Sequence, residues 1–168
     1  MIVVLMGVTG SGKSTIGELL AERVDAVFAD ADDYHPAANK KKMAAGHPLN
    51  DEDRQPWLET LNCLMHGWYD KGKSGVLACS ALKQKYRETL SVDMPAGTIH
   101  FVWLDASPKL LAERLAARHH EFMNPHLLKS QLDTLEPPAD ALRIVNDRTP
   151  DEVVGRILQQ LPSGTQSK

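Results

Sequence analysis

The sequence lacks the long apolar runs that place a chain in a membrane. No apolar stretch approaches the ~20 residues that span a bilayer. The apolar run at residues 2–6 is too short for the core of a signal peptide, and no basic segment precedes it. We therefore expect a cytoplasmic protein with no membrane partner.

Cysteine is scarce, and neither sign of charge dominates. Cys63 and Cys79 are the 2 cysteines, and they form no CxxC or metal-binding pattern, which favours a reducing compartment. The 7 histidines do not have the spacing of a zinc site. With 19 basic and 22 acidic residues the formal net charge is -3, so no overall field attracts nucleic acid. An anion site must be local.

What the sequence does contain is an alternation of strand-like and helix-like segments. At 168 residues, with 42% hydrophobic residues, the chain is long enough for one core. Short runs rich in Val and Ile, apolar on both faces, are typical of strands covered by helices on both sides. Apolar residues at three- and four-residue spacing lie between them. The pattern predicts a three-layer α/β fold with a parallel sheet. The expected strands are Ile2–Met6, Ala26–Ala29, Gly75–Cys79, Ile99–Leu104 and Leu142–Val145.

Three segments interrupt this regular pattern. The proline-containing stretch 36–56 is irregular, and a helical segment is expected to open at Trp57. Residues of about 118–126 break the helical pattern and are interpreted as a mobile lid. We expect one domain over residues 1–161 and a flexible tail over 162–168, which offers no apolar residue for burial.

The strongest motif follows the first predicted strand and precedes an amphipathic helix. It satisfies G-x-x-x-x-G-K-[ST], whose backbone N–H groups surround phosphate. Lys13 is expected to reach the β- and γ-phosphates, and the Ser14 hydroxyl is expected to ligate Mg²⁺. The alternative is a glycine-rich turn with an exposed lysine. The nucleotide-binding residues predicted here are Gly7, Val8, Thr9, Gly10, Ser11, Gly12, Lys13, Ser14 and Thr15.

Other classes of nucleotide-binding protein fit less well. A GTPase needs [NT]-K-x-D and D-x-x-G motifs, and the sequence contains neither. A motor ATPase usually has a long apolar strand that ends in an acid, which Asp105 resembles. Because Ser107-Pro108 follows, we interpret that stretch as the cap of a helix.

Acidic residues follow the second predicted strand, at the edge where ligands of open α/β sheets bind. Asp30 and Asp32 share a face of an extended chain, so one can hold Mg²⁺ while the other accepts the proton of an attacking hydroxyl. A solvated acidic turn is the alternative. His35 fits a hydrogen-bonding core residue as well as a substrate contact.

Basic residues after later strands can bind anions. Arg54, Lys83 and Arg87 are candidates for holding a substrate carboxylate. Arg118, beside the expected lid, is the candidate for stabilising the charge of the transferred phosphoryl group, and Arg114 for packing near adenine. Each is also compatible with a solvated surface cation.

From Met6 to about Pro138 the sequence resembles the gluconate kinase family, a branch of the shikimate- and nucleoside-monophosphate-kinase-like P-loop proteins. The Asp-Arg-x-Pro-Trp-Leu and Ala-Cys-Ser-Ala-Leu-Lys blocks are its specific features. At the lid the family usually reads Arg-x-Gly-His-Phe-Met, whereas this chain has Arg118-His119-His120-Glu121-Phe122-Met123. The main blocks are Asp30-Ala31-Asp32-Asp33-Tyr34-His35-Pro36, Asp53-Arg54, Pro56-Trp57-Leu58, Ala78-Cys79-Ser80-Ala81-Leu82-Lys83 and Leu135-Glu136-Pro137-Pro138.

The resemblance implies an ATP- and Mg²⁺-dependent kinase that phosphorylates the 6-hydroxyl of D-gluconate. It implies that Asp32 is the base, that Asp30 is the acid on the metal side, and that Ser80 and His35 contact substrate hydroxyls. It also implies a five-stranded parallel sheet, a closing lid and a homodimer. A shikimate- or nucleotide-type kinase and a non-catalytic ATP-binding regulatory module are the alternatives.

Overall fold

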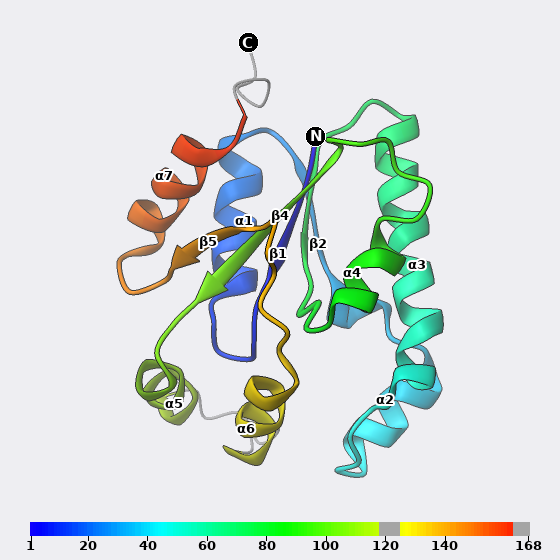
Figure 1. Cartoon of the computed structure of the whole chain (residues 1–168), viewed down its shortest axis with the longest axis vertical. Helices are drawn as coiled ribbons and strands as arrows, with labels where there is room; N and C mark the ends of the chain where they lie inside the picture. The colour runs from blue at the N-terminus through cyan, green and yellow to red at the C-terminus, as the bar shows by residue number, and fades with distance from the viewer. Residues whose placement is uncertain (118–124, 163–168) are drawn as a thin grey trace.

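A computed structural model describes residues 1–117 and 125–162 of the chain. Its centre is a five-stranded sheet in the order β2-β3-β1-β4-β5, in which every pair of neighbours is parallel (Figure 1). The expected three-layer α/β fold is confirmed. The five predicted strands are also present, with ends that differ by at most one residue. The strands are β1 (Ile2–Met6), β2 (Val27–Asp30), β3 (Gly75–Ala78), β4 (Ile99–Asp105) and β5 (Leu142–Val145).

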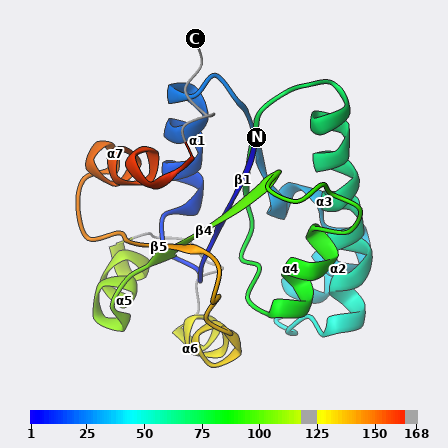
Figure 2. The same cartoon turned by 45° about the horizontal axis from the view of Figure 1, so that its top comes forward.

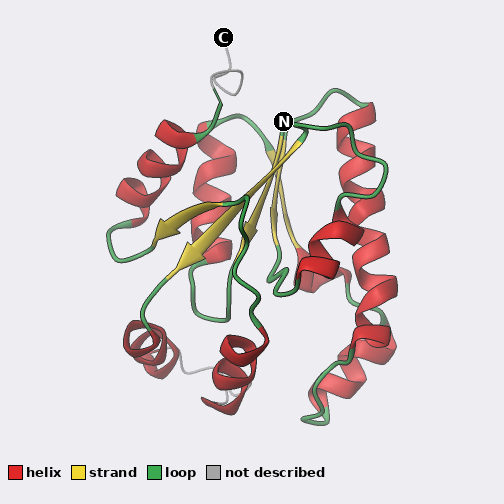
Figure 3. Ribbon diagram, in the orientation of Figure 1, coloured by secondary structure: helices red, strands yellow, loops and turns green. Residues whose placement is uncertain are grey.

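Helices cover both faces of the sheet and create two cores. On one side α1 and α7 pack through Ile16, Leu20 and Ile157. On the other side α3 and α4 pack through Leu61 and Leu90. Because β1 contacts both layers, all five of its residues are buried. Figures 2 and 3 show the layers on either side of the strands. The helices are α1 (Lys13–Arg23), α2 (Ala37–Ala44), α3 (Asp51–Asp70), α4 (Gln84–Leu90) and α7 (Pro150–Gln160), with a 3₁₀ turn, η1 (Ala31–Tyr34).

Helix α3 begins six residues before Trp57, where the sequence predicted its start. Asn50 and Asp53 form a capping box, in which each side chain accepts the other residue's backbone N–H. This cap fixes the helix start upstream of Pro56, which the helix accommodates in its second turn. The predicted start at Trp57 was wrong because proline usually marks a helix boundary, whereas here it lies inside the helix.

Two helices lie beyond the carboxyl ends of the strands. In Figure 1 the strands run downward toward α5 (Pro108–Ala117) and α6 (Pro125–Thr134). The Ser107 hydroxyl accepts the N–H of Leu110, which confirms the predicted helix cap. The carboxylate of Asp105 instead accepts from Arg143 on β5.

Some predictions fall on residues outside the described part of the chain. Arg118 and nearly all of the predicted lid, 118–126, belong to this group, as does the predicted tail beyond residue 162. Among the helices that the structure describes, none combines the length and the apolar character needed to cross a bilayer.

Candidate active site

The glycine-rich loop between β1 and α1 adopts a conformation that requires glycine. Gly12 has a φ of 94°, and a Cβ there would lie 2.5 Å from Nδ2 of Asn146. A Cβ on Gly7 would lie 2.7 Å from the carbonyl oxygen of Leu104. The Lys13 side chain folds back over the loop, and its ammonium donates to the carbonyls of Gly7 and Val8, both at 3.0 Å. The backbone of the loop is therefore closely packed, and the Lys13 ammonium lies against it.

Groups from other parts of the chain hold this loop in place. The N–H of Gly7 donates to the carbonyl of Ser80, which follows β3. Asn146, directly after β5, donates from Nδ2 to the carbonyl of Ser11 at 2.7 Å. Gln131 of α6 accepts the N–H of Thr9 at 2.6 Å. Three separate elements therefore fix the shape of the loop.

The acids after β2 lie against the start of α1. The Ser14 hydroxyl donates to Oδ2 of Asp30 at 2.6 Å, and Oδ1 of Asp30 accepts the backbone N–H of Asp32 at 3.0 Å. Asp30 is thus the N-cap of η1, and it fixes the backbone from which the Asp32 side chain projects. The structure brings together the motif hydroxyl and both predicted acids.

Neighbouring protein groups shift the pKa of Asp32. Desolvation by the surrounding protein, and then repulsion from the Asp30 carboxylate, raise the pKa of Asp32 above its ordinary value, whereas the Lys13 ammonium lowers it. Because 86% of the Asp32 side chain is exposed, water screens part of these effects. A raised pKa makes a carboxylate a better proton acceptor. Lys13 and Asp32 are close enough to influence one another.

These residues have the chemistry that a nucleotide with Mg²⁺ requires. The ring of backbone around Gly12 is too tight for side chains, as a phosphate cradle must be. The hydroxyl of Ser11 is buried and has no hydrogen-bond partner among the described residues. Ser14 and Asp30 offer hard oxygen atoms side by side, which are the ligands that Mg²⁺ prefers. The donor set fits both groups.

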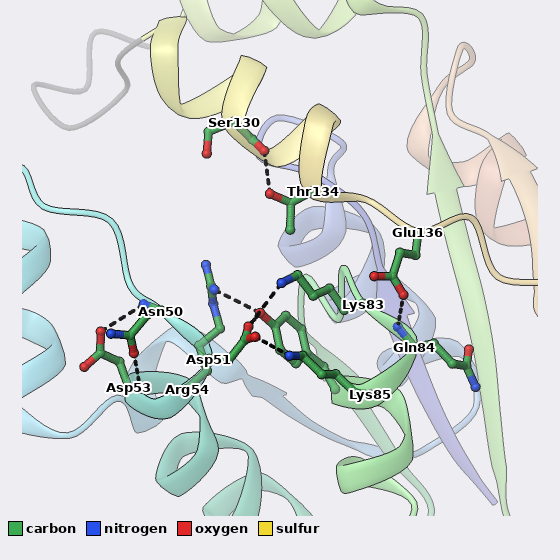
Figure 4. A network of polar contacts seen from close by, with 11 residues as sticks. Asn50, Asp51, Asp53, Arg54, Lys83, Gln84, Lys85, Ser130, Thr134 and Glu136 are labelled. Atoms are coloured by element: carbon green, nitrogen blue, oxygen red, sulfur yellow. Dashed lines mark hydrogen bonds and ion pairs between the residues drawn. The ribbon is translucent and has the colours of Figure 1, made fainter.

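A second polar cluster joins the start of α3 to the start of α4 (Figure 4). Asp51 accepts from Nζ of Lys83 at 3.2 Å and forms further short contacts with Lys85 and the Tyr86 hydroxyl. Arg54 donates to the same hydroxyl at 3.0 Å, and its guanidinium lies 5.4 Å from the Tyr86 ring centre. These hydrogen bonds hold the pKa of Asp51 well below its ordinary value, so it stays ionised. Two predicted substrate-binding cations, Arg54 and Lys83, therefore share one anchor.

The remaining predicted arginines differ from this pair. Arg87 is buried, and its guanidinium donates to the carbonyls of Ala81 and Glu136 and to the side chain of Gln84. In the structure it joins α4 to the segment after α6, and substrate binding by Arg87 stays a prediction. Arg114 donates to the carbonyl of Asn146 at 2.5 Å, beside the phosphate loop.

His35 follows η1 and is enclosed by protein. Its side chain is 6% exposed, and its ring stacks on Trp57 with 4.2 Å between ring centres. Burial first, and then the charges of Arg54 and Lys40, lower the pKa of His35 to about 4. The ring is neutral at physiological pH, and its Nε2 lies 3.8 Å from Oδ1 of Asp32.

Several residues that shape the site were not predicted from the sequence. Asn146 and Gln131 fix the loop from more than a hundred positions away, which no local pattern reveals. Asp51 and Tyr86 stand inside or beside blocks that carry the family resemblance, but only the fold shows that they meet. An acid placed just after an N-cap was the one signal available for Asp51.

The chain is similar to proteins of known families over most of its length. The sequence model of the shikimate kinase family matches residues 9–162. A probable gluconokinase of Xenopus tropicalis is 46% identical over 159 residues, which cover 86% of this chain and 83% of that protein. The thermosensitive gluconokinase of Escherichia coli (strain K12) is 47% identical over 143 residues, covering 84% of this chain and 75% of that one.

Solved structures agree with the sequence relatives. A gluconokinase from Sinorhizobium meliloti 1021 superposes with a TM-score of 0.86 at 38% identity, over 97% of this chain and 92% of that one. A shikimate kinase from Aquifex aeolicus, 19% identical with a TM-score of 0.61, shares the fold. With the phosphate loop, the paired acids and these relatives taken together, the chain belongs to the gluconokinase family of shikimate-kinase-like P-loop kinases.

Proposed function

We propose that this protein transfers the γ-phosphate of ATP to the 6-hydroxyl of D-gluconate, giving 6-phosphogluconate. The observation that carries the proposal is the contact of the phosphate-loop hydroxyl, Ser14, with Asp30, which in turn fixes the backbone of Asp32. The loop proposed to bind ATP and the proposed proton acceptor therefore lie at the same edge of the sheet. The gluconokinase relatives support gluconate as the acceptor.

The acceptor is held by its carboxylate in this proposal. Arg54 and Lys83 supply two positive charges that Asp51 and Tyr86 fasten in place. A guanidinium and an ammonium together can bind both oxygens of a carboxylate. Such binding leaves the far end of a six-carbon acid, which carries the 6-hydroxyl, free to extend toward Asp32. Ser80 is proposed to bind a hydroxyl of the same substrate.

The chemistry divides among the residues of the site. Asp32 accepts the proton of the 6-hydroxyl as that oxygen attacks the γ-phosphorus, and the bond from this phosphorus to the bridging oxygen breaks so that ADP leaves. The backbone N–H groups of the phosphate loop and the Lys13 ammonium bind the phosphate oxygens, where negative charge collects. Arg118, outside the described residues, is proposed to add its charge to the same oxygens, and Arg114 to lie near adenine. Ser14 and Asp30 would hold Mg²⁺, which when bound neutralises charge on the phosphates.

The test is a coupled assay of purified protein with ATP, Mg²⁺ and a panel of acceptors that includes gluconate, other aldonates, shikimate and nucleoside monophosphates. We expect turnover with gluconate. Turnover with shikimate or a nucleotide alone would replace the proposal with one of its alternatives.

An ATP-binding regulatory module is the other alternative, and Asp32→Asn distinguishes it. The exchange keeps the size of the side chain but removes the proton acceptor. A kinase should lose about 10²–10⁴-fold in kcat while its ATP affinity is preserved. A regulatory module would have no turnover to lose.

We also infer, from family resemblance, a homodimer in the cytoplasm. Light scattering of the purified protein at several concentrations tests the dimer, and a mass of one chain throughout would refute it.

A further inference from the structure

The neighbourhood of His35 fixes which of its ring nitrogens carries the proton. Asn39 of α2 is buried, and its Nδ2 donates to the backbone carbonyl of Asp53 at 2.9 Å. A carbonyl can only accept, so this bond sets the orientation of the Asn39 amide. The same Nδ2 lies 3.4 Å from Nδ1 of His35 and directs its second hydrogen there.

The N–H of Asn39 determines which nitrogen of the His35 ring carries the proton. Because Nδ1 faces an N–H donor, it must be the unprotonated, accepting nitrogen. A neutral imidazole has one proton, which is then on Nε2. A doubly protonated ring would set Nδ1–H against the Asn39 N–H, and burial of the ring also disfavours the charged form.

Stacking on Trp57 fixes the plane of the His35 ring, and the Asn39 contact at Nδ1 favours the edge orientation seen here. Trp57 stacks on it with 14° between the ring planes, and the Trp57 indole is itself tied to the carbonyl of Ala31 by a 2.7 Å hydrogen bond. Asp32 lies within the 3₁₀ turn η1, and His35, three residues later, is the C-cap residue of that turn. Nε2 therefore points to the Asp32 carboxylate, 3.8 Å away.

We propose that Asn39 locks His35 as the Nε2–H tautomer and that this N–H orients the Asp32 carboxylate toward the acceptor hydroxyl. The Asp32 side chain is exposed, so a small rotation brings its oxygen within hydrogen-bonding distance of Nε2. His35 is then a positioning residue that acts through the base. The inference rests on the proposed role of Asp32 as that base.

The first experiment reads the tautomer without using activity. Long-range ¹H–¹⁵N correlation spectra of the full chain at pH 7 distinguish a protonated from an unprotonated ring nitrogen. We expect His35 to show a protonated Nε2 and an unprotonated Nδ1. A protonated Nδ1 would overturn the proposal, whatever the acceptor of the enzyme proves to be.

The second experiment compares the activity of two His35 variants, one that keeps an N–H donor and one that only fills the same space. In His35→Gln the side-chain amide can place an N–H near the position of Nε2, whereas His35→Met fills the space without a donor. We expect His35→Met to lose about 10–100-fold in kcat with the KM for ATP unchanged. His35→Gln should retain at least ten times more activity than His35→Met. Equal losses in both variants, or none in His35→Met, would refute the role.

A matched control is available on α3. His66 is half-buried, and its Nε2 contacts the carbonyl of Val92. It lies twelve residues, or about 18 Å of helix, beyond Arg54. His66→Met should leave kcat and both KM values at their original level, and a loss there equal to that of His35→Met would refute a specific effect of His35.

If the wild-type protein does not phosphorylate gluconate, the proposed function is refuted. The spectra would still decide the tautomer, so the two failures are distinguishable.

Discussion

At the scale of single residues, Gly12 is a position where the loop tolerates little change. Gly12→Ala combines a φ of 94° with a Cβ only 2.5 Å from Nδ2 of Asn146. Asn146 is buried and bonded to the loop, so it cannot move without breaking its bond to the Ser11 carbonyl. We expect at least a tenfold loss of ATP affinity by calorimetry, together with about 2–4 kcal/mol of destabilisation.

Gly97→Ala is the control for this exchange. Gly97 has a φ of 81°, and a Cβ there meets no atom of the described residues within 4 Å. It therefore isolates the backbone strain, about 1 kcal/mol, from the steric clash. Equal effects in the two variants would show that the contact with Asn146 does not matter.

His35 makes stability depend on pH in a defined window. Its pKa is about 4 in the folded protein against 6.5 for an ordinary histidine, so the unfolded chain binds the proton more tightly. Stability contributed by the neutral ring is complete above pH 6.5 and is lost as the pH falls from 6.5 toward 4, by up to about 3 kcal/mol. Urea unfolding of wild type and His35→Gln between pH 4 and 7 measures this.

The readout is the difference between the two unfolding curves. His35→Gln should show the smaller decline with acid, because glutamine does not titrate. Parallel curves would contradict the assignment of a neutral, buried imidazole. Comparing the variants also cancels the contribution of acidic groups that titrate in both, such as Asp53, whose pKa is lowered chiefly by its hydrogen bond with Lys42.

At the scale of elements, Asp51 and Tyr86 join the start of α3 to the start of α4. Asp51→Asn removes the anion that fastens Lys83, and through Tyr86 it loosens Arg54. We expect the KM for gluconate to rise about tenfold, because the two cations are no longer held in place before the substrate binds. The KM for ATP should not change, since the phosphate loop lies between β1 and α1 and not on α3 or α4.

Steady-state kinetics with each substrate varied in turn tests this separation. Asp133→Asn on α6 is the control, because its ion pair with Lys129 is an exposed (i, i+4) contact. An equal rise in both KM values of Asp51→Asn would indicate general damage to the fold rather than loss of an anchor for the acceptor.

The elements also show what the sequence could and could not predict. Runs such as Ile2–Met6 are apolar on both faces because both faces are covered, and that local signature located every strand. Helix α3 was misplaced because a capping box outweighed the boundary suggested by Pro56. The phosphate loop and the acids were predicted from motifs, whereas Asn146 and Gln131 act across long sequence separations, where side-chain contacts depend on packing.

At the scale of the whole molecule, both helical layers pack against the same sheet. Strand β1 lies at its centre, with Val4 and Met6 in one core and Val3 and Leu5 in the other. Neither layer can lose its packing without exposing the strand that the other layer covers. We therefore expect the chain to unfold as one cooperative unit.

Binding of nucleotide should shift that single transition upward. ATP with Mg²⁺ at 100 times its Kd stabilises the folded state by about 2.7 kcal/mol, which for a chain of this size raises Tm by roughly 5–10 °C. Calorimetry with and without ATP and Mg²⁺ measures the shift. Lys13→Ala should reduce it at the same ATP concentration, because the ammonium proposed to bind the phosphates is gone while the core is untouched. Two transitions, of which ATP moves only one, would mean that the two cores unfold separately and that the phosphate loop stabilises only its own half of the sheet.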